Sequence, residues 1–412
     1  MLFFLPDWED RVDPDYDFME DKHSREKSQS YQKDVYAHQL FSSPPYDGLL
    51  VSLSVFKNKI RLNHRSEVRG LSSIREYLKV PKSSSLRIMG DCGAFSYVKE
   101  KVPPEDFGID KVADLYASLR FDWGVSTDHL IPDSLELSEK EFRRTLTLQN
   151  AREFIRYHAK KGYAFEPVGA VQGYCPDSYE ESAVKTVEMG YKVIGIGSLV
   201  QRSDEELLSI ARKVIRALKG KKVHVHLFGV LRLKVLKELR SLGIGSFDSA
   251  SFLRKAWLRT GRNYLTKEGT WYSAIRIPYS DNPDLLKSAL QKGYGLKDVK
   301  ELEERALYAV REYAKGKARL EDTLKAVLEY DSLLTRKFDR NDNYEQYKKT
   351  LSEKPWELCD CEICRKVGVE VIIFRGANRN KRRGLHNIKV FYDWFLNRGS
   401  NEGKSSSPTD CR

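Results

Sequence analysis

Short β-rich runs alternate with helical stretches through the first two thirds of this chain. The runs are "GLLVSLSVF", "LRIMG", "FDWGVS", "PVGAVQG", "KVIGIG", "VHVHLFGV" and "IGSFDS". Stretches of helical periodicity separate most of them, including "EKEFRRTLTLQNAREFIRYHAKKG" and "SDEELLSIARKVIRALKG". Such alternation is typical of a parallel sheet, and this many strands in sequence favour a closed (β/α)8 TIM barrel over an open sheet. The segment "WYSAIRI" is the candidate for the remaining strand.

A polar residue or a glycine stands at the point where most of these runs end. They are Asp91 in "GDCGAF", Asp128 in "STDH", Gln172 in "QGYC", Gly197 in "GIGS" and Asp248 in "FDSAS". Barrel enzymes carry their chemistry at the C-terminal ends of the strands, so we expect these residues to share one mouth. A single Asp there is usually a helix cap, but three on one face favour catalysis. Two carboxylates facing one sugar can divide glycosidic chemistry into attack and proton transfer.

The pair His224 and His226 offers a different reading of the same barrel. Strand alternation places both imidazoles on one side, as in barrel hydrolases that bind a catalytic metal. Such sites need further His and Asp ligands on later strands, and only an Asp in "IGSFDS" is available. A metallohydrolase is therefore the weaker alternative.

A cysteine cluster near the C-terminus predicts a metal site. Cys359, Cys361 and Cys364 form a C-x-C-x₂-C run, and His386 follows. Three thiolates and one imidazole suit tetrahedral Zn²⁺ and leave no open position, so the zinc would be structural. An iron–sulfur cluster usually takes four cysteines. Half of the six cysteines fall here, which is unlike a disulfide framework and favours a reducing cytoplasm.

A dense basic run separates those cysteines from the histidine. The chain carries a net charge of +12 and a pI near 9.2, a balance that suits a polyanionic partner. We predict that the run is a loop that meets nucleic-acid phosphates; the alternative is a solvated loop whose charge nearby acids balance. Its members are Arg375, Arg379, Lys381, Arg382 and Arg383.

The N-terminal segment has the opposite charge. The stretch "DWEDRVDPDYDFMED" holds eight acids and one base, and it is either an ordered arm on a basic surface or a solvated tail. We expect residues 1–45 to form this extension, 46–335 the barrel, 336–398 a zinc-binding subdomain with the last helix, and 399–412 a disordered tail. The apolar run "LFFL" is too short for a signal peptide or a membrane span, and no segment reaches the roughly 18 apolar residues that a span needs.

Taken in order, these motifs make the chain similar to the tRNA-guanine transglycosylase family. The matching blocks are "GDCGAFSY", "FDWGVSTDHL", "GAVQGY", "IGIGSLV", "VHLFGV", "SFDSASFLRKAWLRTGRNYLT" and the cysteine cluster followed by "LHNIKVFYDWF". The resemblance implies that Asp248 is the nucleophile at C1′, that Asp91 is the general acid/base, and that the cysteine cluster holds one structural zinc. It implies a base-binding set of Asp128, Gln172, Phe95 and the backbone at Gly195 and Gly197.

The sequence departs from the tRNA enzymes in ways that indicate a branch. Cys92 and Ala94 stand where Ser and Gly are usual, and "DHLI" stands at the recognition aspartate. We also expect no RNA-binding PUA-type domain after the zinc-binding subdomain. The chain most resembles the DNA-modifying branch, which exchanges guanine in DNA for a 7-deazaguanine such as 7-cyano-7-deazaguanine through a glycosyl-aspartate intermediate. The alternatives are exchange in tRNA and a catalytically silent nucleic-acid-binding paralogue. An accessory ATPase or helicase and a homodimer are further partners that this family allows.

Overall fold

The computed structural model describes residues 1–56, 71–258, 261–334 and 343–400, and the chain forms two units. The first unit combines Met1–Glu9 with Tyr46–Ala250, and the second combines Asp10–Pro45 with the chain from Ser251 onward. The units divide after Glu9, Pro45 and Ala250, whereas the expected divisions lie after residues 45, 335 and 398. The predicted tail lies outside the described residues from position 401 on. Within the described ranges, no helix has the length and apolar character needed to cross a bilayer.

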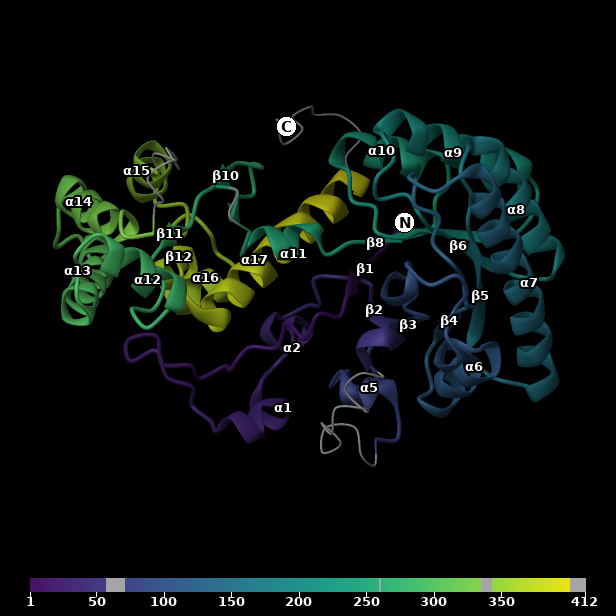
Figure 1. Cartoon of the computed structure of the whole chain (residues 1–412), viewed down its shortest axis with the longest axis horizontal. Helices are drawn as coiled ribbons and strands as arrows, with labels where there is room; N and C mark the ends of the chain where they lie inside the picture. Colours follow the sequence, from purple (N-terminus) through teal and green to yellow (C-terminus); the bar gives the residue numbers. More distant parts are fainter. Residues whose placement is uncertain (57–70, 259–260, 335–342, 401–412) are drawn as a thin grey trace. The chain divides into compact units, whose positions relative to one another are not determined.

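The first unit is a closed barrel of parallel strands that pair in chain order, which confirms the predicted fold class (Figure 1). The strands are β1 Leu2–Pro6, β2 Gly48–Ser52, β3 Arg87–Asp91, β4 Trp123–Val125, β5 Glu166–Val171, β6 Val193–Ile196, β7 His224–Leu227 and β8 Ser246–Asp248.

The N-terminal run "LFFL" supplies the strand that sequence reasoning did not place. Phe4 pairs with Gly48 on β2 and with Asp248 on β8, so β1 closes the barrel. The prediction for "WYSAIRI" was wrong, because Trp271–Tyr272 (β10) and Ile275–Arg276 (β11) belong to two small separate sheets. A parallel barrel strand is buried on both faces, so its sequence is a continuous apolar run. This short run was not assigned as a strand because acidic residues follow it directly.

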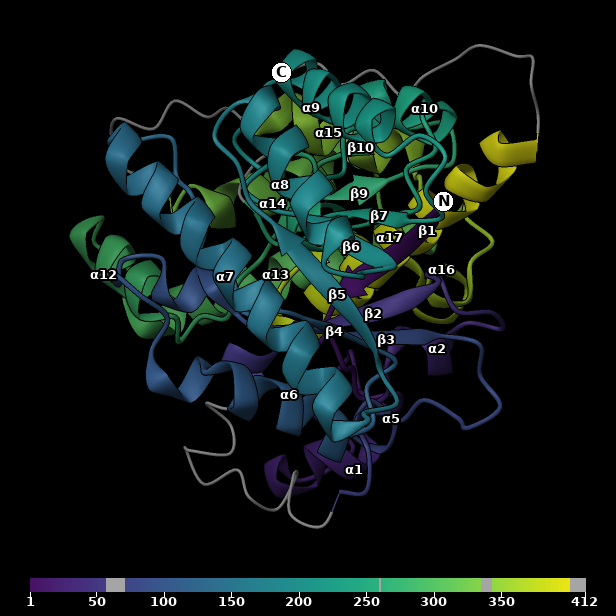
Figure 2. The ribbon, with the colours of Figure 1, turned by 90° about the vertical axis from the view of Figure 1, so that its right-hand side faces the viewer.

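Large side chains fill the barrel interior, and helices cover its outside. The interior cluster includes Phe4, Met89, Trp123 and Val168, all buried. Helices α7, α8 and α9 lie along the outer side of the sheet near β5 and β6 (Figure 2). The predicted helical stretches are confirmed as α7 and α9. The unit's helices are α5 Ile74–Tyr77, η2 Ala94–Tyr97, η3 Glu105–Phe107, α6 Ile109–Ser118, α7 Leu137–Lys161, α8 Pro176–Glu188, α9 Asp204–Ala217 and α10 Leu233–Ser241.

The second unit is mainly helical and includes the acidic arm, residues 10–45. Its core elements are the long helix α17 Gly376–Ser400 and the helix pair α13 Leu296–Ala314 and α14 Leu320–Asp331. The remaining elements are η1 Lys27–Gln29, α1 Ser30–Lys33, α2 Ala37–Leu40, α11 Ser251–Lys255, β9 Tyr264–Leu265, β10, β11, α12 Pro283–Gln291, α15 Tyr344–Glu353, α16 Glu362–Val367, η4 Gly368–Ile372 and β12 Ile373–Phe374.

Candidate active site and metal centre

Three aspartates come together at the C-terminal ends of the barrel strands. Asp91 is the last residue of β3, Asp248 is the last residue of β8, and Asp128 follows β4. The pKa of Asp91 is raised to about 7, mainly by burial and further by the negative charges of Asp128 and Asp248. Hydrogen bonds from Gly93 and Ser52 act in the opposite direction. Asp91 is therefore suited to take up and release a proton near neutral pH.

Asp128 and Gln172 form a buried polar pair. Gln172 Nε2 donates to Asp128 Oδ2 at 2.5 Å, and the Cys92 thiol donates to Oδ1 at 3.0 Å. Burial raises the pKa of Asp128, while these two hydrogen bonds lower it. Gln172 is 2% exposed, and its Oε1 has no hydrogen-bond partner in the described part of the chain. A buried acceptor of this kind favours a ligand that brings a donor.

Gly197 makes room for Gln172, and Gly195 makes room for the Phe228 ring. A Cβ on Gly197 would lie 2.3 Å from Gln172 Nε2, and one on Gly195 would lie 2.3 Å from the Phe228 ring. The Gly197 N–H donates to Val171 O at 3.0 Å, and its carbonyl accepts from the Tyr179 hydroxyl at 3.0 Å. The Gly197 amide therefore already donates a hydrogen bond within the barrel.

Phe95 lies on the short helix η2 that follows β3. Its ring is 74% exposed, in contrast to the neighbouring Tyr97, which is buried. Tyr97 donates its hydroxyl to the backbone carbonyl of Asp128 at 2.9 Å and so connects this helix to the segment after β4. An exposed aromatic ring four residues after Asp91 offers a stacking surface.

The carboxylate of Asp248 is buried and held by two donors. Its Oδ1 accepts from His226 Nε2 at 3.1 Å and from the Gly229 N–H at 3.0 Å. His226 Nδ1 and His224 Nε2 both contact Ser246 Oγ, at 2.8 and 2.7 Å. Sequence reasoning identified both histidines but missed Ser246 and Gly229, although alternation along β8 places Ser246 on the face of Asp248.

This arrangement gives the two histidines no metal site. Within the described residues, the metal-type donors that cluster in a group of three or more are the predicted cysteines and His386. His224 is instead a neutral hydrogen-bonding group, since burial lowers its pKa to about 4. The metallohydrolase alternative thus has no support in the barrel.

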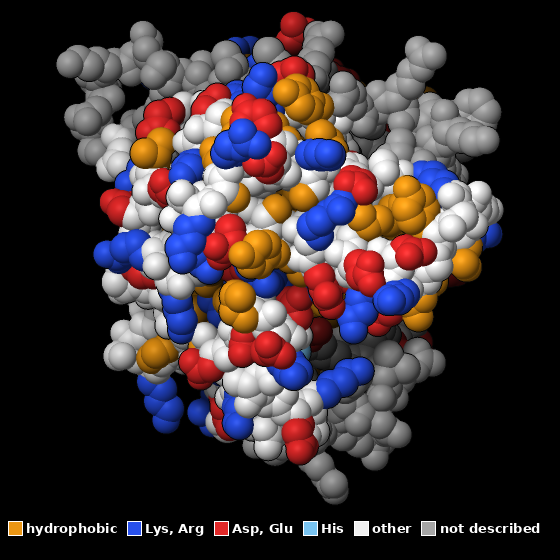
Figure 3. Space-filling model, turned by 90° about the vertical axis from the view of Figure 1, so that its left-hand side faces the viewer, with side chains coloured by type: hydrophobic (Ala, Val, Ile, Leu, Met, Phe, Trp, Pro, Cys, Tyr) orange, Lys and Arg blue, Asp and Glu red, His pale blue; other side chains and the backbone are white. Residues whose placement is uncertain are grey.

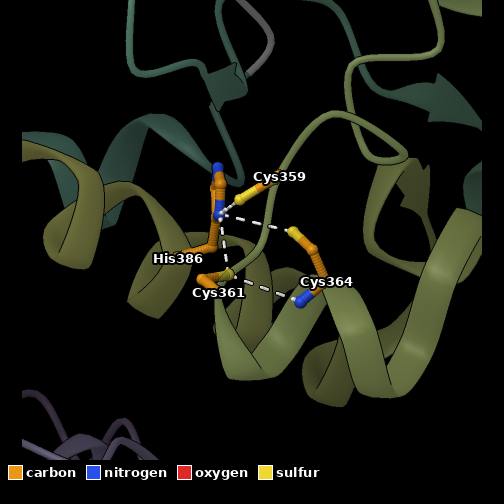
Figure 4. A group of neighbouring side chains, drawn as sticks. All are labelled: Cys359, Cys361, Cys364 and His386. Carbon is orange, nitrogen blue, oxygen red and sulfur yellow. Dashed lines mark hydrogen bonds between the residues drawn. The ribbon is translucent and has the colours of Figure 1, made fainter.

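The predicted metal ligands do converge, in the second unit (Figure 4). His386 Nδ1 lies 3.7 Å from Cys359 Sγ and 3.4 Å from the sulfurs of Cys361 and Cys364. A tetrahedral zinc ion with bonds near 2.3 Å to sulfur and 2.0 Å to nitrogen separates its ligand atoms by about 3.5–3.8 Å. The four side chains can therefore hold a metal ion such as zinc.

Neighbouring groups fix the orientation of the histidine. His386 Nε2 contacts the Leu265 carbonyl at 2.7 Å, so Nδ1 faces the sulfurs. The Tyr264 ring stacks on the imidazole with centroids 4.1 Å apart. Asn387 accepts from the Leu265 N–H at 2.9 Å, which joins α17 to β9. The cluster thus connects α16, β9 and α17.

Arg375 directly precedes helix α17 and the other members of the basic run lie in that helix, so the prediction of an exposed phosphate-binding loop was wrong. Its four arginines are buried: Arg375, Arg379, Arg382 and Arg383 are at most 6% exposed. Arg383 donates to the carbonyls of Ala256, Val371 and Ile373, and burial lowers its pKa to about 9. Lys381 is half-buried and donates to the Arg11 carbonyl at 3.3 Å.

The acidic arm supplies the counter-charges. Asp21 accepts from Arg375 Nε at 2.6 Å and also from Arg379 Nη1. Arg379 Nε donates to Glu370 at 2.7 Å, and Arg375 forms an ion pair with Glu303 at 2.5 Å. The two residue runs of opposite charge therefore neutralise each other inside the second unit. Of the two readings of this segment, the contacts favour an ordered arm, whose partner is this buried cluster.

The outer surface mixes both signs of charge. On the face seen in Figure 3, basic and acidic side chains are interspersed. Helix α13 shows the same pattern, with Lys297 near Glu301 and Lys300 near Glu304. The net positive charge is thus not gathered into a stripe on that face.

A closed parallel barrel with acids gathered at the C-terminal ends of its strands has the architecture of a TIM-barrel enzyme. Residues 103–373 match the family described as TGT, queuine tRNA-ribosyltransferase. The chain is 34% identical over 408 residues to a DNA-guanine transglycosylase of Salmonella montevideo. The aligned region covers 95% of this chain and 96% of that protein. The chain therefore belongs to the TGT family and is a guanine transglycosylase.

Proposed function

We propose that this enzyme exchanges guanine in DNA for a 7-deazaguanine base, with 7-cyano-7-deazaguanine as the incoming base. The observation that carries the proposal is the buried pair of Asp128 and Gln172 beside Asp91 and Asp248. A guanine edge presents an N–H and an amino group, and Asp128 with the unpartnered Gln172 Oε1 supplies acceptors for them. The relative from Salmonella montevideo and the "GDCGAF" block favour DNA over tRNA.

The chemistry follows from the two remaining acids. Asp248 attacks C1′, the bond from C1′ to guanine breaks, and Asp91 gives its proton to the departing base. The sugar is then an ester of Asp248. Asp91, now ionised, takes the proton from the incoming base, which attacks C1′ and releases the Asp248 carboxylate. A pKa of about 7 lets Asp91 act as the general acid in the first step and as the general base in the second.

Asp248 is only 4% exposed, which constrains the nucleic acid. A stacked, paired guanine cannot reach a buried carboxylate, so the target base leaves the helix before reaction. Phe95, exposed beside the site, is proposed to stack on a base. A partner ATPase or helicase that opens duplex DNA would meet this requirement. Comparing single-stranded with duplex DNA, with and without such a partner, tests that need.

Transfer of labelled guanine tests the substrate. The protein is incubated with labelled guanine and either DNA or tRNA, and label is measured in each polymer. Incorporation into DNA is expected, whereas label confined to tRNA would establish the alternative. Digestion of the DNA after incubation with 7-cyano-7-deazaguanine, followed by mass spectrometry of the nucleosides, identifies the inserted base.

The variant Asp248→Asn separates an enzyme from a silent nucleic-acid-binding paralogue. It removes the nucleophile but keeps the shape of the side chain, so exchange should cease while DNA affinity stays near wild type. Exchange that persists in Asp248→Asn would assign the nucleophile elsewhere. A covalent adduct of DNA with wild-type protein, absent in the variant, would support the glycosyl-aspartate intermediate.

We propose that zinc occupies the cysteine cluster and has a structural role. The cluster lies in the second unit and uses all four donors, so it offers no open coordination position. Its ligands come from the segment before α16, from α16 and from α17, and the metal would hold these together.

A further inference from the structure

We infer that His226 and Ser246 are positioning residues that hold Asp248 by one oxygen, Oδ1, and leave Oδ2 as the attacking atom. The inference rests on the proposed function, because it assigns atoms within the same nucleophile. It concerns side chains of β7 and β8, which lie next to each other in the barrel.

The two oxygens of Asp248 have different surroundings. Oδ1 accepts two hydrogen bonds, from His226 Nε2 at 3.1 Å and from the Gly229 N–H at 3.0 Å. Gly229 has a φ of +69°, a conformation that brings its amide to the carboxylate and that suits glycine. Among the described residues, none donates a hydrogen bond to Oδ2. An oxygen that accepts two hydrogen bonds is the poorer nucleophile, so Oδ2 reacts.

Ser246 determines which ring nitrogen of His226 faces Asp248. Its Oγ contacts His226 Nδ1 at 2.8 Å and His224 Nε2 at 2.7 Å. A hydroxyl has one proton and two acceptor sites, so Ser246 can satisfy both rings at once. A carboxylate that acts as a nucleophile only accepts hydrogen bonds, so Nε2 of His226 carries a proton toward Asp248.

Packing keeps the His226 ring in place. Phe228 contacts it with centroids 4.6 Å apart, and Phe4 of β1 meets it edge-on at 5.7 Å. The ring is fully buried, so it cannot turn without displacing these side chains. The carboxylate is therefore held in one orientation by a ring that two aromatic side chains pack against.

Two substitutions at one position test the inference. In His226→Leu the donor to Oδ1 is lost, whereas in His226→Gln the side-chain amide can place an N–H near the position of Nε2. We expect kcat for guanine exchange to fall roughly 10- to 100-fold in His226→Leu with KM for guanine unchanged, because Asp128 and Gln172 bind the base from other strands. His226→Gln should recover most of the rate, and Ser246→Ala should lie between the two.

Equal losses in both His226 variants, or a rise in KM without a change in kcat, would overturn the inference. Crystal structures of wild type and His226→Leu provide a second test that does not depend on enzyme activity. We expect the Asp248 carboxylate to rotate in the variant, and an unchanged carboxylate would refute its positioning by His226. A wild-type protein that exchanges no guanine in DNA or tRNA would instead refute the proposed function.

Discussion

The buried cluster of the acidic arm makes a strong prediction about stability. Asp21 contacts Arg375 Nε at 2.6 Å and also Arg379, and the side chains of the three residues are 11%, 6% and 1% exposed. Asp21→Asn keeps the shape but removes the charge, and places an amide against two guanidinium groups. Breaking a buried ion pair from one side costs about 3–5 kcal/mol. At about 2–4 °C per kcal/mol for a unit of this size, the melting temperature should fall by roughly 6–20 °C.

Differential scanning calorimetry measures this effect, with Glu20→Gln as the matched control. Glu20 is the neighbour of Asp21 in the arm, but its pair with Lys22 is exposed, with side chains 65% and 74% accessible. Exposed pairs contribute about 0–1 kcal/mol, so Glu20→Gln should melt close to wild type. If Asp21→Asn also melts like wild type, the arginines are not stabilised by the arm. A gain in affinity for oligonucleotides at unchanged stability would restore the phosphate-binding interpretation, because the arginines would then be released to contact phosphates.

Three further predictions concern the site and the metal. Burial and neighbouring charge raise the pKa of Asp91 to about 7, so wild type should lose stability relative to Asp91→Asn as pH rises from 4 to 7. Thermal melts of both proteins at pH 4 and pH 7 measure this. A difference in melting temperature between the two proteins that is the same at both pH values would contradict it. The same variant should lose base exchange at every pH, measured by label transfer. Gly197→Ala places a Cβ against Gln172 and should raise KM for guanine roughly 10-fold with less effect on kcat, and an unchanged KM would argue against this packing. Cys361→Ser should lose the metal by elemental analysis and lower the melting temperature, whereas Cys175→Ser should do neither.

The strand ends of the barrel could be predicted because their chemistry is local. Asp91, Asp128 and Asp248 each follow an apolar run, and a parallel barrel brings all such ends to one side. The cysteine cluster was predictable for a similar reason, since three of its ligands are close in sequence. In both cases the positions of the residues along the chain are enough to predict that their side chains lie close together.

The roles of the charged runs were not predictable in this way. Asp21 and Arg379 contact each other although they lie 358 positions apart, and neither run shows its partner. A basic run without a visible counter-charge is read as exposed, because burial of unpaired arginine is costly. Strand β1 was missed for a related reason, since its partners β2 and β8 begin 48 and 246 residues into the chain. Long-range pairing decides all of these features.

The acidic arm has a consequence for the order in which the protein is made. During synthesis, residues 10–45 leave the ribosome early, and the arginines of α17 emerge last. The nascent arm therefore carries its negative charge without native partners while the barrel strands are being completed. Contacts of such high sequence separation form slowly, so the closing of this cluster should be a late step. A chain that stops before α17 would keep every strand of the barrel and still leave Asp21 without Arg379.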